Sequence, residues 1–485
     1  MKLKNPLMRI SGSQKALLVL FLITLPLVNP WVRGDGVGYY AYVRAMLIEG
    51  RLDFVKDWQH ANQSFQMYRV GPDGKPKQAG YTATGHLDNH FAIGPSILWS
   101  PFLIVVHGTV VLADRLGAHI PADGFSWPYL DTMAFATALY GFLALLISFE
   151  LARRYFPQRW ALLATIGIWF ASSLPVYMYF NPSWSHAHSA FIVALFLWYW
   201  DRTRGTRTIF QWAILGLIAG LLMDVYYPNV FLLLAPVMES LQHYYKGIRR
   251  LSNNRSLGQL VLGNLAFMVT TIIAFLPTPI TRMVIYGRPF ASGYGDVGKW
   301  SWLRPHLLRI LFSSDHGLVS WTPIILFAAL GLFVVLRLDR QLGAILITIL
   351  FAYDYLIACS PFWDGLSSFG NRYFLPLTPI FIIGLAGTFT AIEEFWNAQR
   401  AKILAYGATA ILIVWNLGFI FQWGTHLVPA RGPISWREMT HNQFTVVPVA
   451  IVDNVERYIL HRHALMNDIE KSDVKQLERT GPRPN

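Results

Sequence analysis

The chain has 485 residues, of which 54% are hydrophobic, 15% aromatic and only 14% charged. A soluble domain does not need so much apolar surface, so the composition excludes an ordinary globular protein and indicates a polytopic membrane protein. The net charge of +13 would suggest nucleic acid in a soluble protein. Here the basic side chains lie in short loops between apolar segments, where we expect them to contact anionic membrane lipids and no nucleic acid. The single cysteine, Cys359, excludes an intramolecular disulfide.

Apolar segments of membrane-spanning length recur along most of the chain. Counting runs of roughly 17–25 residues, with some shorter ones, predicts an all-α polytopic transmembrane bundle of about eleven spans. The predicted spans are residues 16–32, 129–150, 160–180, 187–201, 209–224, 226–240, 257–280, 318–336, 341–358, 373–391 and 402–421. A further apolar segment, Phe91 to Leu112, contains Gly94, Pro95 and Pro101. Its hydropathy alone does not decide whether it crosses.

The distribution of basic residues decides how this segment is interpreted. Lys and Arg cluster in every second loop, as expected of cytoplasmic loops. The clusters are Arg153/Arg154/Arg159, Arg202/Arg204/Arg207, Lys246/Arg249/Arg250/Arg255, Arg337/Arg340 and Arg400/Lys402. The N-terminus, with Lys2, Lys4 and Arg9, is basic too and is expected on the same side. The basic loops and the basic N-terminus can all lie on the cytoplasmic side only if 91–112 does not cross the membrane. We therefore predict a juxtamembrane or re-entrant helix pair at the outer face.

This topology divides the chain into two parts. Residues 1–424 form the membrane domain, with a cytoplasmic N-terminus and a long outer loop at about 32–128 that carries juxtamembrane helices. The spacing of apolar residues from Tyr39 to Phe54 predicts a helix lying in the membrane interface. Residues 425–485 are expected to form a partly disordered tail at the outer face, with a weakly amphipathic stretch around Val449 to Leu460.

Asp35 stands directly after the first span, in the run Arg33-Gly34-Asp35-Gly36-Val37-Gly38-Tyr39-Tyr40. A carboxylate at the boundary between lipid and water is costly to desolvate, which makes Asp35 a candidate general base. The structural alternative is a helix N-cap, since Asp favours that position and glycine neighbours suit a turn. A cap would not exclude catalysis.

Other polar and aromatic motifs gather at the predicted outer loop ends. Desolvating such groups near spans is unfavourable, so their presence on one side suggests a cavity with a polar ligand. The candidate cavity residues are Tyr39, Tyr40, His86, His90, His186, His188, Tyr226, Tyr227, Trp363, Asp364 and Tyr373. For the aromatic residues the alternative is the interfacial belt found in any membrane protein.

The order of these features resembles the GT-C fold glycosyltransferases. A first span is followed by an acidic residue and paired aromatics, then by a long outer loop, and much later by Phe369-Gly370-Asn371-Arg372-Tyr373. Within that fold the chain looks most like the branch of protein O-mannosyltransferases and aminoarabinose transferases. The resemblance implies sugar transfer from a polyprenyl-phosphate donor with inversion, with Asp35 as the base, and suggests a bacterial inner membrane with the active site outside.

The chain also departs from that pattern. Glycines flank Asp35 where the family often has a second acidic residue, and His86, Asp88, Asn89 and His90 precede the juxtamembrane segment where a Lys-Pro-Pro-like stretch is common. The donor sugar therefore stays open, and so does the acceptor, for which lipid, glycan and protein hydroxyls are all compatible.

Arg372 is the first candidate for the lipid phosphate. Sugar transfer leaves a phosphate whose charge a fixed cation stabilises through bidentate hydrogen bonds. The alternative is that Arg372 pairs with Asp364 or caps a loop. Lys299 and His316 are further phosphate candidates, although a solvated surface role fits each of them as well.

The histidines raise the question of a metal. His186 and His188, or His86, Asp88 and His90, could be combined with Asp35 on paper, but these spacings match no strong metal motif. We therefore expect hydrogen-bonding roles and no cofactor, with a divalent cation as the alternative.

The main competing function is a transporter or lipid flippase. Polar residues at one face and no visible inverted repeat weigh against it. A non-catalytic scaffold, as a third possibility, would leave Asp35 and Arg372 far apart.

Overall fold

A computed structural model of the chain describes residues 11–249, 257–291 and 297–481. In these residues the regular structure is helical, apart from two isolated β-bridges, Val70 with Pro76 and Tyr81 with Leu87. The predicted all-α class is confirmed. Lys2, Lys4, Arg9, Arg250 and Arg255, which support the charge argument for topology, lie outside the described residues.

Every predicted span coincides with helical structure. The helices are α1 (Gly12–Thr24), α6 (Trp127–Ala152), α7 (Gln158–Phe170), α8 (His186–Thr203), α9 (Ile209–Val225), α10 (Leu234–Ile248), α11 (Leu257–Phe275) followed by α12 (Pro277–Tyr286), α15 (Ile324–Leu338), α16 (Arg340–Cys359), α17 (Thr378–Phe395) and α18 (Ala398–Gly424). By length and composition, six helical segments among the described residues are long and apolar enough to cross a membrane, and three shorter apolar helices accompany them. The chain is an integral membrane protein, and the number of crossings stays a prediction.

Two segments of the outer loop differ from expectation. The segment predicted as a helix pair is one continuous helix, α5 (Gly94–Arg115), because Pro95 occupies its first turn and Pro101 is accommodated within it. The helix expected to lie in the interface is α2 (Asp35–Arg44), extended by one π turn to Glu49. Residues 36–45 are all buried, so α2 lies inside the protein and does not present one apolar face to lipid.

The glycines of α2 explain this burial. A Cβ on Gly36 would lie 2.0 Å from Ser183 Oγ, and one on Gly38 would lie 1.9 Å from the Phe91 ring. The helix can therefore pack more closely on its neighbours than a helix with side chains at these positions.

The C-terminal segment also differs from the expected partly disordered tail. It forms α19 (Trp436–Thr445), α20 (Val447–Leu460), which contains the predicted amphipathic stretch, and α21 (Arg462–Thr480). The polar composition of α21 suggested disorder, but two of its acidic side chains bind the outer loop, as described below.

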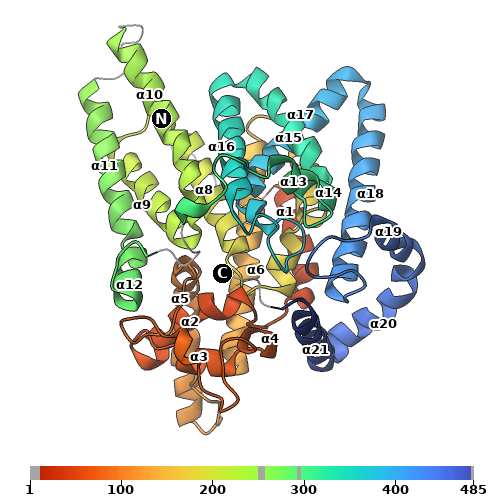
Figure 1. Cartoon of the computed structure of the whole chain (residues 1–485). Coiled ribbons are helices and arrows are strands. Elements are labelled where there is room, and N and C mark those ends of the chain that lie inside the picture. Colours follow the sequence, from red (N-terminus) through yellow and green to blue (C-terminus); the bar gives the residue numbers. More distant parts are fainter. Residues whose placement is uncertain (1–10, 250–256, 292–296, 482–485) are drawn as a thin grey trace.

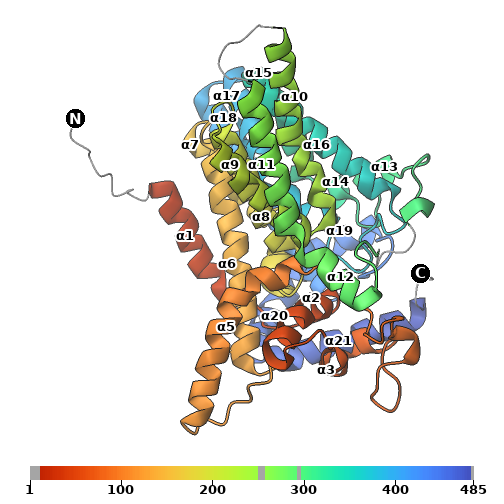
Figure 2. The same cartoon turned by 90° about the vertical axis from the view of Figure 1, so that its left-hand side faces the viewer.

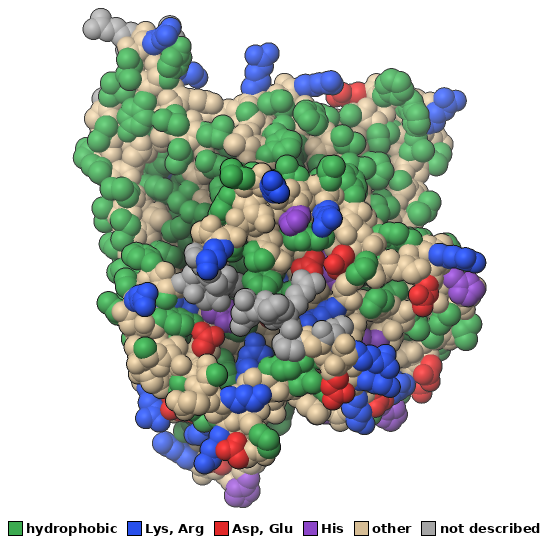
Figure 3. Space-filling view, viewed as in Figure 1, with side chains coloured by type: hydrophobic (Ala, Val, Ile, Leu, Met, Phe, Trp, Pro, Cys, Tyr) green, Lys and Arg blue, Asp and Glu red, His purple; other side chains and the backbone are tan. Residues whose placement is uncertain are grey.

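The two ends of the bundle differ in character. The end of α10 and the turns joining α15 to α16 and α17 to α18 lie at the upper end in Figures 1 and 2, whereas α2, α12, α20 and α21 lie at the lower end. Hydrophobic side chains cover much of the upper half in Figure 3, with Lys and Arg along its upper edge, and charged side chains of both signs gather below. This is the distribution expected of a bundle embedded in lipid. Which end faces the cytoplasm stays a prediction.

Close contact between α15 and α17 holds the centre of the bundle together. A Cβ on Gly331 would lie 1.8 Å from the carbonyl oxygen of Gly384, so these two backbones touch directly. We expect Gly331→Ala to force the helices apart and to lower the stability of the protein by about 1–3 kcal/mol. Thermal unfolding of the detergent-solubilised protein measures this effect. Gly407→Ala on α18, where a Cβ would meet nothing within 4 Å, is the matched control, and equal melting temperatures for the two variants would contradict the expected contact.

Candidate active site

Asp35 is the first residue of α2. The N-cap position belongs to Gly34, whose φ of +54° is readily adopted by glycine, so the alternative that Asp35 is the cap is wrong. The carboxylate instead lies in the first helical turn, where the helix dipole favours negative charge. With 34% of its side chain exposed, Asp35 remains accessible from the cavity described below.

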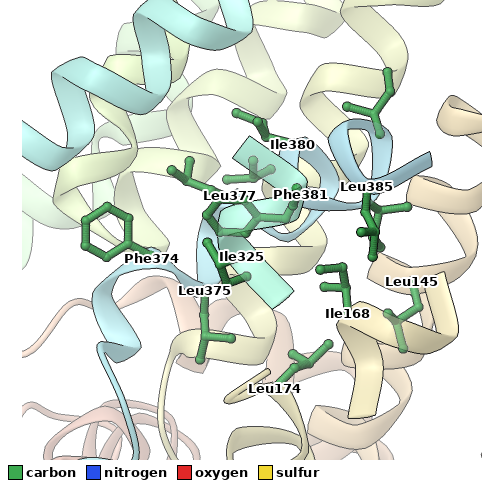
Figure 4. Close-up of a cluster of buried hydrophobic side chains, with 14 of the residues drawn as sticks. Leu145, Ile168, Leu174, Ile325, Phe374, Leu375, Leu377, Ile380, Phe381 and Leu385 are labelled. Atoms are coloured by element: carbon green, nitrogen blue, oxygen red, sulfur yellow. The ribbon is translucent and has the colours of Figure 1, made fainter. Parts of the chain in front are cut away.

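Arg372 is placed by the hydrophobic core. It begins a short 3-10 helix, η7 (Arg372–Leu377), which leads directly into α17. The following residues Phe374, Leu375 and Leu377 are buried in a cluster with side chains of α7, α15 and α17, shown in Figure 4. Because this cluster fixes the backbone, the guanidinium group has a defined position at the end of the bundle.

The two residues meet as an ion pair. Arg372 Nη1 lies 2.7 Å from Asp35 Oδ2, and only 6% of the Arg372 side chain is exposed. The guanidinium carbon lies 4.2 Å from the ring centre of Trp184, which covers its flat side. Within the described part of the chain Arg372 Nε has no hydrogen-bond partner. The separation expected for a non-catalytic scaffold is therefore not found between Asp35 and Arg372.

A cavity of about 2000 Å³ surrounds this ion pair. Its wall comes from α2, the outer loop, α18, α20, α21 and the lower ends of several long helices. Nine of the predicted residues line it, namely Asp35, Arg372, Lys299, Tyr39, His90, His186, Tyr226, Tyr227 and Tyr373. Residues that lie far apart in the chain therefore meet at one cavity, and their roles stay predictions.

Six predicted residues are not among those that line the cavity, and each contacts other parts of the protein. Tyr40 donates a hydrogen bond to the carbonyl of Gly124 at 2.7 Å. The ring of His188 packs against Trp99 and Tyr140 within the bundle.

The other four lie in or beside loops. His316, a phosphate candidate, is completely buried, with its ring 4.5 Å from that of Trp321. His86 contacts Thr84, and Trp363 lies against His306. Asp364 is buried and its carboxylate accepts a hydrogen bond from the backbone of Leu366. None of these four residues lines the cavity.

Trp184 was missed as a site residue. Its indole N–H donates to the carbonyl of Arg33 at 2.9 Å, while its ring covers Arg372. It therefore connects the segment before Asp35 to the guanidinium. The only sequence signal was its place in the polar run from Asn181 to His188.

A second cluster of polar side chains, around Arg282 and Asp88, lies on the cavity wall, and the sequence predicted only its members His90 and Tyr227 as cavity residues. Arg282 of α12 donates to the carbonyls of Asn89 and Phe91 and to the hydroxyl of Tyr227. Beside it Asp88 accepts hydrogen bonds from His90 and Tyr286. Burial alone would raise the pKa of Asp88, but these two partners hold it below its ordinary value. The Asp88 carboxylate stays anionic at neutral pH, and its contact with Tyr286 binds the outer loop to α12.

The expectation of no cofactor stays a prediction. Among the described residues no three His, Cys, Asp or Glu side chains lie close enough together to hold a metal ion. His186 and His188, which are two residues apart on α8, have different neighbours: His186 lines the cavity and His188 packs inside the bundle.

No family model and no curated protein sequence matches the chain. Several solved structures are similar in fold. An oligosaccharyltransferase from Archaeoglobus fulgidus, in complex with Zn and sulfate, is 15% identical with a TM-score of 0.50, and the match covers 84% of this chain and 55% of that one. ArnT from Cupriavidus metallidurans, bound to undecaprenyl phosphate, is 16% identical with a TM-score of 0.48, and the match covers 95% of this chain and 73% of that one. The arabinosyltransferase EmbB from Mycobacterium smegmatis is 13% identical with a TM-score of 0.45, and the match covers 98% of this chain and 41% of that one.

These likenesses concern the fold alone, because the identities are low. The chain has the GT-C fold, so the fold that the resemblance implied is confirmed. It spans about half the length of the oligosaccharyltransferase, 55% of that chain.

Proposed function

We propose that the chain is a membrane glycosyltransferase that moves a sugar from a polyprenyl-phosphate-linked donor to an acceptor hydroxyl. The observation that carries this proposal is the ion pair of Asp35 and Arg372 inside a large cavity. A carboxylate and a buried arginine at contact distance supply the base and the phosphate-binding group that this reaction requires.

The wall of the cavity suits a donor of this kind. One part is apolar and includes Leu417 and Phe421 of α18 and Val455 and Ile459 of α20. Another part carries the charged and aromatic side chains around Arg372. A prenyl chain fits the first environment and a sugar phosphate the second, so one molecule with both parts matches the cavity.

The reaction follows from the two groups. Asp35 takes the proton of the acceptor hydroxyl as the acceptor oxygen forms its bond to the anomeric carbon. The bond from that carbon to the phosphate oxygen breaks, its electron pair stays on the phosphate, and Arg372 binds the developing charge. Attack from the face opposite the phosphate inverts the anomeric centre. We place this reaction at the outer face of a bacterial inner membrane, as the basic loops suggest.

A transporter or flippase is less well supported. It needs a polar route that reaches both ends of the bundle. The residues that line the cavity come from the lower end in Figure 1, near α2, α12 and α21, and those of the α15–α16 and α17–α18 turns at the other end are not among them.

A reconstituted assay tests the proposal. The purified protein in nanodiscs is supplied with a panel of polyprenyl-phosphate sugars and with membrane extract as the source of acceptor. Mass spectrometry then follows release of free polyprenyl phosphate and the sugar-bearing product. We expect one donor to be consumed with matching product. Movement of intact donor between leaflets of a vesicle without consumption would favour the flippase instead.

A further inference from the structure

The C-terminal helix α21 contacts the segment directly before Asp35. The carboxylate of Asp473 forms an ion pair with Arg33 and accepts a second hydrogen bond from His426 Nε2 at 2.8 Å. Only 15% of the Asp473 side chain is exposed. Burial alone would raise the pKa of Asp473, but Arg33 and His426 hold it below its ordinary value. The contact is therefore made by a charged carboxylate at neutral pH.

A second contact from α21, made by Glu470, reaches Gly34 through Asn62 of the outer loop. Glu470 is buried and accepts hydrogen bonds from Asn62 Nδ2 at 3.0 Å and from the backbone N–H of Ser64 at 2.5 Å. The side-chain oxygen of Asn62 in turn accepts from the backbone N–H of Gly34 at 3.1 Å. Glu470 thus fixes the amide of Asn62 in the orientation that binds Gly34.

Both contacts converge on Arg33 and Gly34, the two residues before the carboxylate of the site. On the other side, Trp184 and Ser183 hold the carbonyl and the N–H of Arg33. Gly34 adopts a φ of +54°, and glycine has many other conformations available, so its backbone needs such restraints to stay in one of them. Contacts from α21 and from Ser183 and Trp184 therefore both restrain Arg33 and Gly34.

We propose that Glu470 and Asp473 are positioning residues for Asp35: α21 fixes Arg33 and Gly34 so that the carboxylate stays within reach of the acceptor hydroxyl. This inference rests on the proposed function for its chemical meaning. The same helix contributes Met466, Ile469 and Asp473 to the cavity wall, so it lies close enough to the reaction for small shifts to matter. A misplacement of about 1 Å at a reacting group can lower the rate by roughly 100-fold.

The first test needs no activity. Hydrogen exchange of the peptide that contains Gly34 is measured in the full-length protein, for wild type and for the double variant Glu470→Gln and Asp473→Asn. We expect exchange at Gly34 to become at least about 10-fold faster, because an opened hydrogen bond exposes the amide. Glu478→Gln, an exposed position on the same helix, is the matched control and should exchange like wild type.

The second test separates positioning from general stability. We expect the double variant to lower kcat by about 10-fold to 100-fold while the KM for the lipid donor changes less than about twofold. In an Asp35→Asn background the same two substitutions should cause no further loss, since they act only through that carboxylate. The single variant Asp473→Asn serves the same purpose if the double variant does not fold.

The outcomes are distinguishable. Unchanged exchange at Gly34, or a loss of kcat that is just as large in the Asp35→Asn background, would overturn the positioning role and leave the proposed function intact. A wild-type protein that consumes no donor, with the exchange effect present, would overturn the proposed function and leave the structural contact established.

Discussion

Asp35→Asn should lower sugar transfer by about 100-fold to 10,000-fold, the range expected when a general base is removed. The amide has nearly the same shape as the carboxylate but cannot accept the proton of the acceptor hydroxyl. Initial rates with the reconstituted protein and its donor measure the effect. Binding of undecaprenyl phosphate should be at least as tight as in wild type, because the variant has no carboxylate to compete for Arg372.

Asp73→Asn is the control for this variant, since Asp73 is an exposed carboxylate elsewhere in the outer loop. It should keep wild-type turnover. Equal rates for Asp35→Asn and wild type would show that another group takes the proton, and a loss of both transfer and lipid binding would indicate a damaged fold.

Arg372→Ala should weaken binding of the lipid phosphate by roughly 2–5 kcal/mol, the range for truncating one partner of a buried, charge-assisted contact. The measurement is an equilibrium titration with undecaprenyl phosphate in nanodiscs. Turnover is a poorer readout here, because the substitution also leaves Asp35 without its ion-pair partner. Arg372→Lys should show an intermediate loss, since lysine keeps the charge but not the planar fork.

The control is Arg337→Ala, an exposed arginine at the end of α15. Its affinity for the lipid should match that of wild type. If Arg372→Ala also bound normally, the phosphate would have to be held by other cations on the cavity wall, such as Arg282 or Lys299.

The fold was largely predictable because long apolar runs translate directly into helices. All eleven predicted spans fall on helical structure, with boundaries that shift where Pro or Gly interrupts the run, as in the stretch from Tyr226 into α10. Asp35 and Arg372 were singled out in the sequence for a related reason. A charged residue at the edge of an apolar segment is costly, so it stands out against its surroundings.

Other parts of the site could not be found in this way. His188 was predicted to line the cavity, yet its ring is enclosed by Trp99 and Tyr140, which come from distant segments. Conversely, Glu470 and Asp473 lie in a polar stretch that is typical of disorder, and their partners Asn62 and Arg33 are more than four hundred residues away. Their roles depend on tertiary contacts for which a single sequence carries no local signal.

The ion pair between Asp35 and Arg372 also has a consequence for the sequence of binding events. The carboxylate is engaged with the guanidinium of Arg372 in this structure. Under the proposed function, a lipid phosphate bound to Arg372 would compete with Asp35 for this guanidinium and would release the carboxylate toward the acceptor. We therefore expect an ordered reaction in which the donor binds before the acceptor, so that the base is activated only when a sugar is present to be transferred.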